Sequence, residues 1–188
     1  MRHEYILTDV DGVLLDWDHH FIHWLNNKGI KTPRSEPSSA KLYEWLGLPE
    51  DVVCAWIEEF NASSEALNIK SFVDIKHLRA LSKKYKVVAI TSCGASEQIR
   101  QNRLKQLERL NIAFHEVHTL GLMDSKKALL AKYKNSVWVE DNQSNALLGH
   151  NLGHTTFLIK RPYNKNFLHD KIRMVNSWLE IKKYLVPA

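Results

Sequence analysis

The chain of 188 residues contains only two cysteines, Cys54 and Cys93, and no long hydrophobic run. Two cysteines are too few for a disulfide framework, which excludes a small disulfide-stabilised fold. No apolar run approaches the roughly 20 residues that a membrane-spanning helix needs. Residues 1–4, which precede the first apolar run, contain no signal-peptide core. We therefore expect a cytoplasmic protein without a membrane partner.

Glycine is scarce as well, with 7 residues, and the chain has no glycine-rich loop of the Walker type for nucleotide phosphates. A cysteine-phosphatase loop is also excluded, because Ile99 stands where an arginine would have to follow Cys93. Hydrophobic residues make up 44% and charged residues 25%, which is typical of globular proteins. A chain of this length forms one domain, or one domain that carries an insertion.

The formal net charge is +5, with lysines and arginines spread through the chain. This balance favours an anionic substrate and leaves nucleic acid open as a less favoured partner. One basic group, which includes Arg100, Arg103 and Arg109, falls in a charged segment with helical character. We predict that most of these basic side chains lie on solvated helix faces.

Short apolar runs alternate with segments of helical periodicity along the chain. Strands separated by helices of this length predict an α/β fold with a mostly parallel sheet covered on both faces. Residues 17–73 contain helices but no strong strand, and they hold four of the six tryptophans. The predicted strands are 4–9, 87–90, 112–117, 137–139 and 155–159, and the predicted helices are 18–28, 38–46, 50–61, 74–84, 95–110, 126–134, 143–151 and 173–185.

Two carboxylates, Asp9 and Asp11, come directly after the first predicted strand. At this spacing they reach one small volume, where they can bind a divalent cation and carry out acid–base chemistry. Gly12 allows the chain to turn away sharply behind them. The pattern also resembles the beginning of a calcium loop, but Val13 and His20 stand where such a loop needs oxygen ligands.

Other polar residues follow the later strands. Ligands of parallel sheets bind at the carboxyl ends of the strands, near the point where the strand order reverses. Thr91 and Ser92 follow the second predicted strand, Glu140 and Asp141 follow the fourth, and Lys126 opens the helix predicted at 126–134. Because these ends meet at one edge of the sheet, we expect the side chains to converge on a single ligand.

The chemistry of these residue types suits phosphoryl transfer, which depends mainly on positioning and charge neutralisation. A carboxylate can act as the nucleophile, and a second carboxyl can donate and accept the proton. Mg²⁺ prefers a few carboxylates together with phosphate oxygens and water. Hydroxyl groups and a lysine would hold the remaining phosphate oxygens. The residues therefore predict a magnesium-dependent enzyme of phosphoryl transfer.

Taken together and in this order, the motifs resemble those of the haloacid dehalogenase superfamily. The resemblance implies a Rossmann-like core. The matching motifs are Asp9-Val10-Asp11-Gly12, Thr91 after a short apolar strand, Lys126, and Glu140-Asp141 followed by Asn145.

The same resemblance implies a role for each matching residue. Asp9 would be the nucleophile and Asp11 the general acid and base, which favours a phosphatase over a dehalogenase. Thr91 and its neighbour Ser92 would bind the phosphate, and Lys126 would neutralise it. The magnesium ion would be held by Asp9, by the backbone carbonyl of Asp11 and by Asp141, with Glu140 and Asn145 as second candidates.

The segment between the first two motifs resembles an inserted helical cap, which divides the chain into a core of residues 1–16 and 74–188 and a cap of residues 17–73. Asp16-Trp17, residues 160–164 and Ser177-Trp178 further resemble the 5'(3')-deoxyribonucleotidase branch. Aromatic side chains of the cap could stack on a base, although each could equally pack in the cap's own core. The candidates are Trp17, Phe21, Trp24, Trp45, Trp56 and Phe60.

We therefore predict a Mg²⁺-dependent phosphomonoester hydrolase that forms an aspartyl-phosphate, with a nucleoside monophosphate as the expected substrate. The alternatives are a phosphatase acting on the 3' ends of polynucleotides and a phosphatase for another small molecule. A non-catalytic binding module is least favoured, because Asp9 and Asp11 are both present. The oligomeric state is not set by the sequence.

Overall fold

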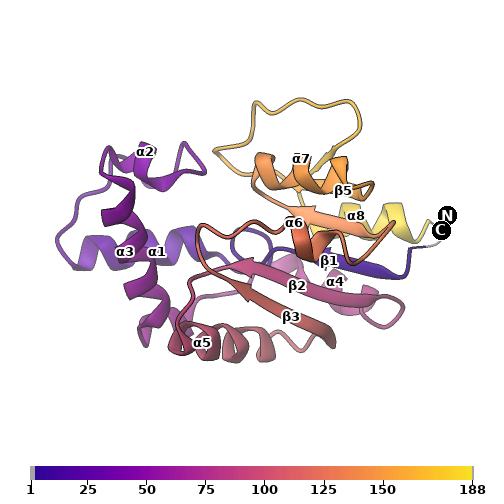
Figure 1. Cartoon of the computed structure of the whole chain (residues 1–188), viewed down its shortest axis with the longest axis horizontal. Coiled ribbons are helices and arrows are strands. Elements are labelled where there is room, and N and C mark those ends of the chain that lie inside the picture. Colours follow the sequence, from indigo (N-terminus) through magenta and orange to yellow (C-terminus); the bar gives the residue numbers. More distant parts are fainter. Residues whose placement is uncertain (1–2, 188) are drawn as a thin grey trace.

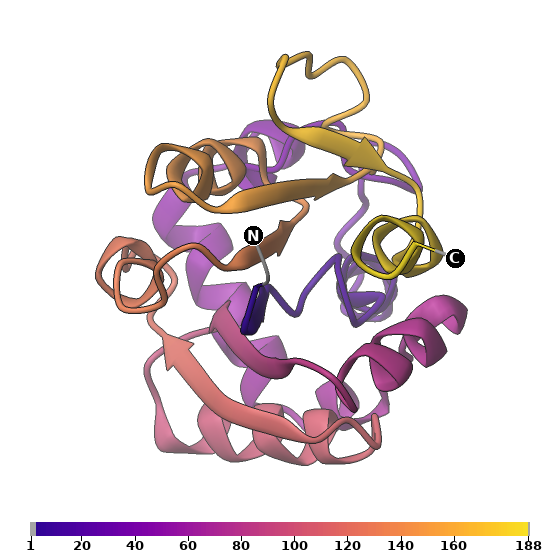
Figure 2. The same cartoon turned by 90° about the vertical axis from the view of Figure 1, so that its right-hand side faces the viewer.

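The computed structural model describes residues 3–187 and contains a six-stranded sheet with the order β3-β2-β1-β4-β5-β6. All pairings between these strands are parallel, which confirms the predicted Rossmann-like α/β fold. Figure 2 shows helices α6 (Lys127–Leu130) and α7 (Gln143–Asn151) on one face of the sheet and α4 (Lys76–Leu81) and α8 (Trp178–Leu185) on the other. The strands are β1 (Tyr5–Thr8), β2 (Lys86–Ser92), β3 (Phe114–Leu120), β4 (Val137–Glu140), β5 (Thr155–Ile159) and β6 (Arg173–Val175).

The helices α1, α2 and α3 lie between β1 and β2 in the chain and extend beyond the carboxyl ends of the strands (Figure 1). We call residues 17–73 the helical insert; its role as a separate cap stays a prediction. The α-helices are α1 (Trp17–Asn27), α2 (Leu42–Leu46), α3 (Glu50–Ala62), α4 (Lys76–Leu81), α5 (Glu97–Glu108), α6 (Lys127–Leu130), α7 (Gln143–Asn151) and α8 (Trp178–Leu185), and two short 3₁₀ helices are η1 (Glu65–Asn68) and η2 (Val73–Ile75).

The central strand β1 is buried on both faces, which explains its continuous apolar run. Its successive residues Ile6 and Leu7 belong to two different hydrophobic clusters, one on each side of the sheet. Val87 and Val88 of β2 divide between the same two clusters. The strand order reverses at β1, because β2 pairs along one edge and β4 along the other. Ligands of such sheets bind at the carboxyl end of this strand.

The prediction of one helix over residues 173–185 is wrong at its beginning, because Arg173–Val175 form β6 beside β5. Helix α8 begins at Trp178, after Ser177 in extended conformation (φ −162°, ψ 162°). The side chain of Glu180 accepts hydrogen bonds from both the backbone N–H and the side-chain amide of Asn176, which closes the turn between the two elements. The three-residue strand is too short for its alternation to stand out from the helical pattern that follows.

Further boundaries differ from the predictions. The helices predicted at 38–46, 74–84 and 126–134 are confined to α2, α4 and α6. Strand β2 runs on to Ser92, so that Thr91 lies within the strand rather than after it. Residues 1 and 2, which were expected to lead into the first strand, lie outside the described part. No helix within residues 3–187 is long and apolar enough to cross a membrane.

Candidate active site

A cavity of about 340 Å³ opens at the carboxyl ends of β1 and β4, between the sheet and the helical insert. Its walls combine residues from the strand ends with residues from the insert. The strand ends and the segments after them contribute Asp9, Asp11, Gly12, Ser92, Lys126, Glu140, Asp141, Asn145 and Tyr163. The insert contributes Trp17, Asp18, Lys41, Tyr43, Glu50 and Asn61 among others.

Asp9 follows β1 directly, and its backbone N–H donates to the carbonyl oxygen of Val139 at 2.9 Å, which continues the pairing with β4. Lys126, at the beginning of α6, places its Nζ 2.9 Å from Asp9 Oδ1 and 3.1 Å from Glu140 Oε2. Burial alone would lower the pKa of Lys126, but the two carboxylates outweigh it and raise this pKa above its usual value. Lys126 is therefore a fixed positive charge beside Asp9.

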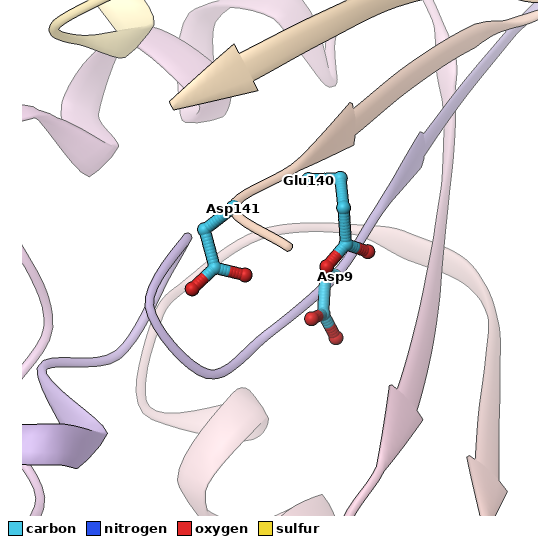
Figure 3. A group of neighbouring side chains, drawn as sticks. All are labelled: Asp9, Glu140 and Asp141. Atoms are coloured by element: carbon cyan, nitrogen blue, oxygen red, sulfur yellow. The ribbon is translucent and has the colours of Figure 1, made fainter. Parts of the chain in front are cut away.

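Asp9, Glu140 and Asp141 each offer a carboxylate oxygen, and these oxygens lie within 4.8 Å of one another (Figure 3). All three residues are buried. Burial, and then the charge of Asp9, raises the pKa of Glu140 well above its usual value and that of Asp141 to about 6. Three ionised carboxylates would exceed the single charge of Lys126. A divalent cation fits this excess, since Mg²⁺ takes oxygen ligands.

Asp141 is held in place by the loop that follows β5. The hydroxyl of Tyr163 donates to its Oδ2, and the amide of Asn164 donates to its carbonyl oxygen at 2.7 Å. The backbone N–H of Arg161 donates in turn to Asn164 Oδ1 at 2.8 Å. Residues more than 20 positions later in the sequence therefore hold Asp141 by hydrogen bonds, so that its carboxylate faces Asp9.

Gly12 is the residue that lets the first motif approach Asp141. Its φ of +72° lies in the left-handed region that favours glycine. A Cβ atom at this position would overlap the carboxylate of Asp141 and lie 3.0 Å from the hydroxyl of Tyr163. The turn after β1 can therefore pass this close to the acidic group only because the residue has no side chain.

Asp11 does not join the three clustered carboxylates. Its Oδ1 and Oδ2 accept hydrogen bonds from Nη1 and Nη2 of Arg103, at 2.7 and 2.6 Å. Burial raises the pKa of Asp11, and the guanidinium of Arg103 opposes that effect. Arg103 is an exception to the expectation that most basic side chains lie on solvated helix faces, since it is only 2% exposed.

The two residues predicted to hold phosphate differ in their surroundings. Ser92 lines the cavity at the end of β2. Thr91 is fully buried, and its hydroxyl has no hydrogen-bond partner within the described residues. A buried hydroxyl without a partner is costly, which fits a group that completes its hydrogen bonds with a ligand. Asn145, the second candidate of the fourth motif, also lines the cavity.

The aromatic candidates of the insert pack mainly against one another. Trp17 stacks on Phe21 with ring centroids 4.7 Å apart, and Phe21 stacks on Trp24 at 5.9 Å. Of the six candidates, Trp17 alone lines the cavity. Phe21, Trp24 and Phe60 belong to the main hydrophobic cluster, and Trp56 is partly buried against that cluster. Trp45 is also buried. Tyr43, which the sequence reasoning did not select, is half-buried and lines the cavity.

Asn61, near the end of α3, connects the insert to the loop after β2. Its Oδ1 accepts from the indole N–H of Trp17 at 2.8 Å, and its Nδ2 donates to the carbonyl oxygen of Cys93 at 2.8 Å. Asn61 is 4% exposed and lines the cavity. One amide therefore fixes the insert against the segment that carries Thr91 and Ser92.

Asp18, in the first turn of α1, is a further carboxylate of the cavity that the sequence reasoning did not select. Burial, followed by the negative charges of Asp141 and Asp11, raises its pKa to about 7. A carboxyl group with this pKa changes its charge near neutral pH, so the charge of the cavity depends on pH.

The sequence of α5 carries a signal for the burial of Arg103. Ile99, Arg103 and Leu107 follow one another at intervals of four, which places them on one face of α5. All three are buried. A charged residue in the middle of an apolar face indicates a buried partner, in this case Asp11. Asn61 and Asp18 have no comparable signal in the sequence.

Three comparisons with known proteins bear on this fold. Neither a protein-family model nor a curated protein matches the chain. Among solved structures, a haloacid dehalogenase-like family hydrolase from Streptococcus pneumoniae matches with a TM-score of 0.64 and 16% identity, over 98% of this chain and 99% of that one.

Two other solved structures have a similar fold and carry ligands. CbbY from Rhodobacter sphaeroides in complex with phosphate matches with a TM-score of 0.58 and 16% identity, over 95% of this chain and 96% of that one. The putative hydrolase YfnB of the same superfamily from Bacillus subtilis, bound to magnesium, matches with a TM-score of 0.55 and 12% identity, over 98% and 99%. At these identities the likeness establishes the fold, which the chain shares with haloacid dehalogenase-like hydrolases.

Proposed function

We propose that the protein is a Mg²⁺-dependent phosphomonoester hydrolase that works through an aspartyl-phosphate on Asp9. The observation that carries the proposal is the buried position of Asp9, with Lys126 Nζ at 2.9 Å and two further carboxylates within reach of one cation. The fold shared with haloacid dehalogenase-like hydrolases supports it, since one such structure contains phosphate and another magnesium.

Asp9 begins the reaction when a carboxylate oxygen attacks the phosphorus atom and the bond to the leaving oxygen breaks. The carboxyl of Asp11 donates its proton to that oxygen, and the alcohol leaves. A water molecule then gives its proton to Asp11 and attacks the phosphorus. Breaking of the acyl phosphate releases inorganic phosphate and restores Asp9.

The other residues of the site bind and neutralise the phosphoryl group. Lys126 holds Asp9 in place and compensates the charge that spreads over the phosphoryl oxygens. Ser92 and Thr91 supply hydroxyl groups from the end of β2. Mg²⁺ held by Asp9 and Asp141, with Glu140 or the carbonyl of Asp11 as a further ligand, would add positive charge at the same oxygens.

A small leaving group suits the cavity better than a polynucleotide end. The cavity is lined by seven carboxylates but only two lysines. Such a wall repels a leaving group that carries several phosphates. We keep a nucleoside monophosphate as the expected substrate, with Trp17 and Tyr43 as the aromatic residues that line the cavity. The carboxylates are those of Asp9, Asp11, Asp18, Glu50, Asp124, Glu140 and Asp141, and the lysines are Lys41 and Lys126.

The test is a phosphate-release assay on the purified protein with MgCl₂ or with EDTA. The substrates are p-nitrophenyl phosphate, a panel of nucleoside 5'-monophosphates and sugar phosphates, and a 3'-phosphorylated oligonucleotide. Asp9→Asn should abolish release, while Asp51→Asn, an exposed position of α3, should leave it unchanged. Release that persists in EDTA or in Asp9→Asn would refute the mechanism. A preference for the oligonucleotide would show that the substrate is a polynucleotide end and not a nucleoside monophosphate.

A further inference from the structure

Arg103 is a buried cation whose partner is a residue of the proposed reaction. Its side chain is 2% exposed, whereas that of Asp11 is 22% exposed and lines the cavity. The two hydrogen bonds to Asp11 run in parallel, from Nη1 to Oδ1 at 2.7 Å and from Nη2 to Oδ2 at 2.6 Å. This fork fixes the plane of the carboxylate as well as its position, which a single ammonium group cannot do.

The helix that carries Arg103 is itself anchored at two positions, Asn102 and Gln106, which lie on one face of α5. The amide of Asn102 donates to the carbonyl oxygens of Asn61 and Ser63 at 3.0 and 3.1 Å. The amide of Gln106 donates to the carbonyl oxygen of Ala66 at 2.6 Å. These contacts hold α5 against residues 61–66 of the helical insert. The position of the Arg103 guanidinium is therefore fixed, and its two hydrogen bonds fix the position and the plane of the Asp11 carboxylate.

We propose that Arg103 is a positioning residue that sets the direction in which the Asp11 carboxyl meets the leaving oxygen and the attacking water. The proposal rests on the acid–base role of Asp11 in the proposed function. Arg103 does not line the cavity within the described residues, so it acts through Asp11 and not on the phosphoryl group.

The two half-reactions depend differently on Asp11, which gives a specific readout. p-Nitrophenolate is a good leaving group and needs little help from an acid. The rate of Asp9 phosphorylation should therefore fall less than the rate of aspartyl-phosphate hydrolysis when Asp11 is misplaced. Hydrolysis of the aspartyl-phosphate needs Asp11 as the base that takes a proton from water, whichever substrate supplied the phosphoryl group. General acid–base catalysis contributes about 10²- to 10⁴-fold, and a misdirected carboxyl should lose about 10- to 100-fold of it.

The experiment compares Arg103→Met, Arg103→Lys, Asp11→Asn and the double variant Asp11→Asn/Arg103→Met with the wild-type protein. Rapid-mixing kinetics with p-nitrophenyl phosphate separate the burst of p-nitrophenolate from steady-state turnover, and mass spectrometry detects the phosphoenzyme. Arg100→Met, three positions earlier and exposed on α5, is the control.

We expect Arg103→Met to show a burst, accumulated phosphoenzyme and a steady-state rate about 10- to 100-fold below wild type. Arg103→Lys keeps the charge without the fork and should show the same pattern, so the test remains available if Arg103→Met does not fold. In the Asp11→Asn background, Arg103→Met should cause no further loss, because its effect passes through Asp11.

Equal slowing of both half-reactions, or an equally large loss in the Asp11→Asn background, would overturn the positioning role. If the wild-type protein releases no phosphate from any substrate, the proposed function fails instead. In that case a double-mutant cycle on the free energy of unfolding still shows whether Arg103 and Asp11 are coupled.

Discussion

Lys126 and Asp9 form a buried ion pair, with Nζ 2.9 Å from Oδ1 and the Lys126 side chain only 3% exposed. The pair joins the beginning of a short helix to the end of the central strand. Because Glu140 shares the same ammonium group, Lys126 compensates two carboxylates at once. Its neighbour Lys127 is exposed, so adjacent lysines of equal charge occupy opposite environments.

Lys126→Met should lower kcat by about 10²- to 10³-fold, because the phosphoryl group loses a fixed positive charge. It should also lower the free energy of unfolding in EDTA, since two buried carboxylates lose their cation. Phosphate release and urea unfolding measure the two effects. Lys127→Met is the matched control, and a loss of activity there with none in Lys126→Met would contradict the assignment.

Gly12→Ala should cost more stability than Gly29→Ala, although both glycines have a positive φ, of +72° and +80°. A Cβ at position 29 meets no atom within 4 Å, so Gly29→Ala measures the backbone cost alone, about 1–2 kcal/mol. A Cβ at position 12 displaces Asp141, so Gly12→Ala should in addition weaken stabilisation by Mg²⁺. Urea unfolding with and without MgCl₂ measures both effects, and equal behaviour of the two variants would refute the contact.

Asp18 should make the metal-free protein less stable as the pH rises. Its pKa of about 7 in the folded protein exceeds the usual 3.8, so the folded state binds the proton more tightly than the unfolded chain does. Its stabilising effect is complete below about pH 4 and is lost as the pH rises through about 7.

The measurement is urea unfolding in EDTA between about pH 4.5 and 7.5. The wild-type free energy of unfolding should fall by on the order of 2–4 kcal/mol more than that of Asp18→Asn over this range. Asp16→Asn, at the residue directly before α1, whose side chain is 40% exposed, should follow the wild-type curve. Parallel curves for wild type and Asp18→Asn would show that Asp18 ionises normally.

Asn61→Ala should weaken phosphate binding without removing any group that contacts the phosphoryl oxygens. The substitution leaves the indole N–H of Trp17 and the carbonyl oxygen of Cys93 without their partner. We expect a loss of about 1–3 kcal/mol in stability and weaker inhibition by inorganic phosphate. Asn26→Ala, on the exposed face of α1, is the control. Unchanged inhibition by phosphate would show that Asn61 does not hold the loop after β2 in the position that binds phosphate.

The sequence was sufficient for the residues at the ends of strands and in the segments directly after them. Asp9, Ser92, Lys126, Glu140 and Asp141 meet in one cavity because parallel strands bring their carboxyl ends to one edge, and the apolar runs locate those ends. Here a local pattern determines a tertiary position.

The sequence was insufficient where a contact depends on how elements pack. The spacing of Ile99, Arg103 and Leu107 indicates that Arg103 is buried, but only the packing of α5 against the turn after β1 reveals that Asp11 is its partner. The aromatic residues of the insert show the same limit. Helical spacing places Trp17 and Phe21 on one face, but the packing decides that only Trp17 reaches the cavity.

The central place of β1 has a consequence for synthesis of the chain. Although β1 leaves the ribosome before its partner strands, it is separated from its two neighbours by about 80 and 130 residues, since Tyr5 pairs with Lys86 and Ile6 with Val137. Such distant pairings fold slowly. Until residue 141 has emerged, the nascent chain carries an apolar strand with an open edge and an incomplete set of carboxylates. Stalled or truncated chains should therefore depend on chaperones to prevent aggregation.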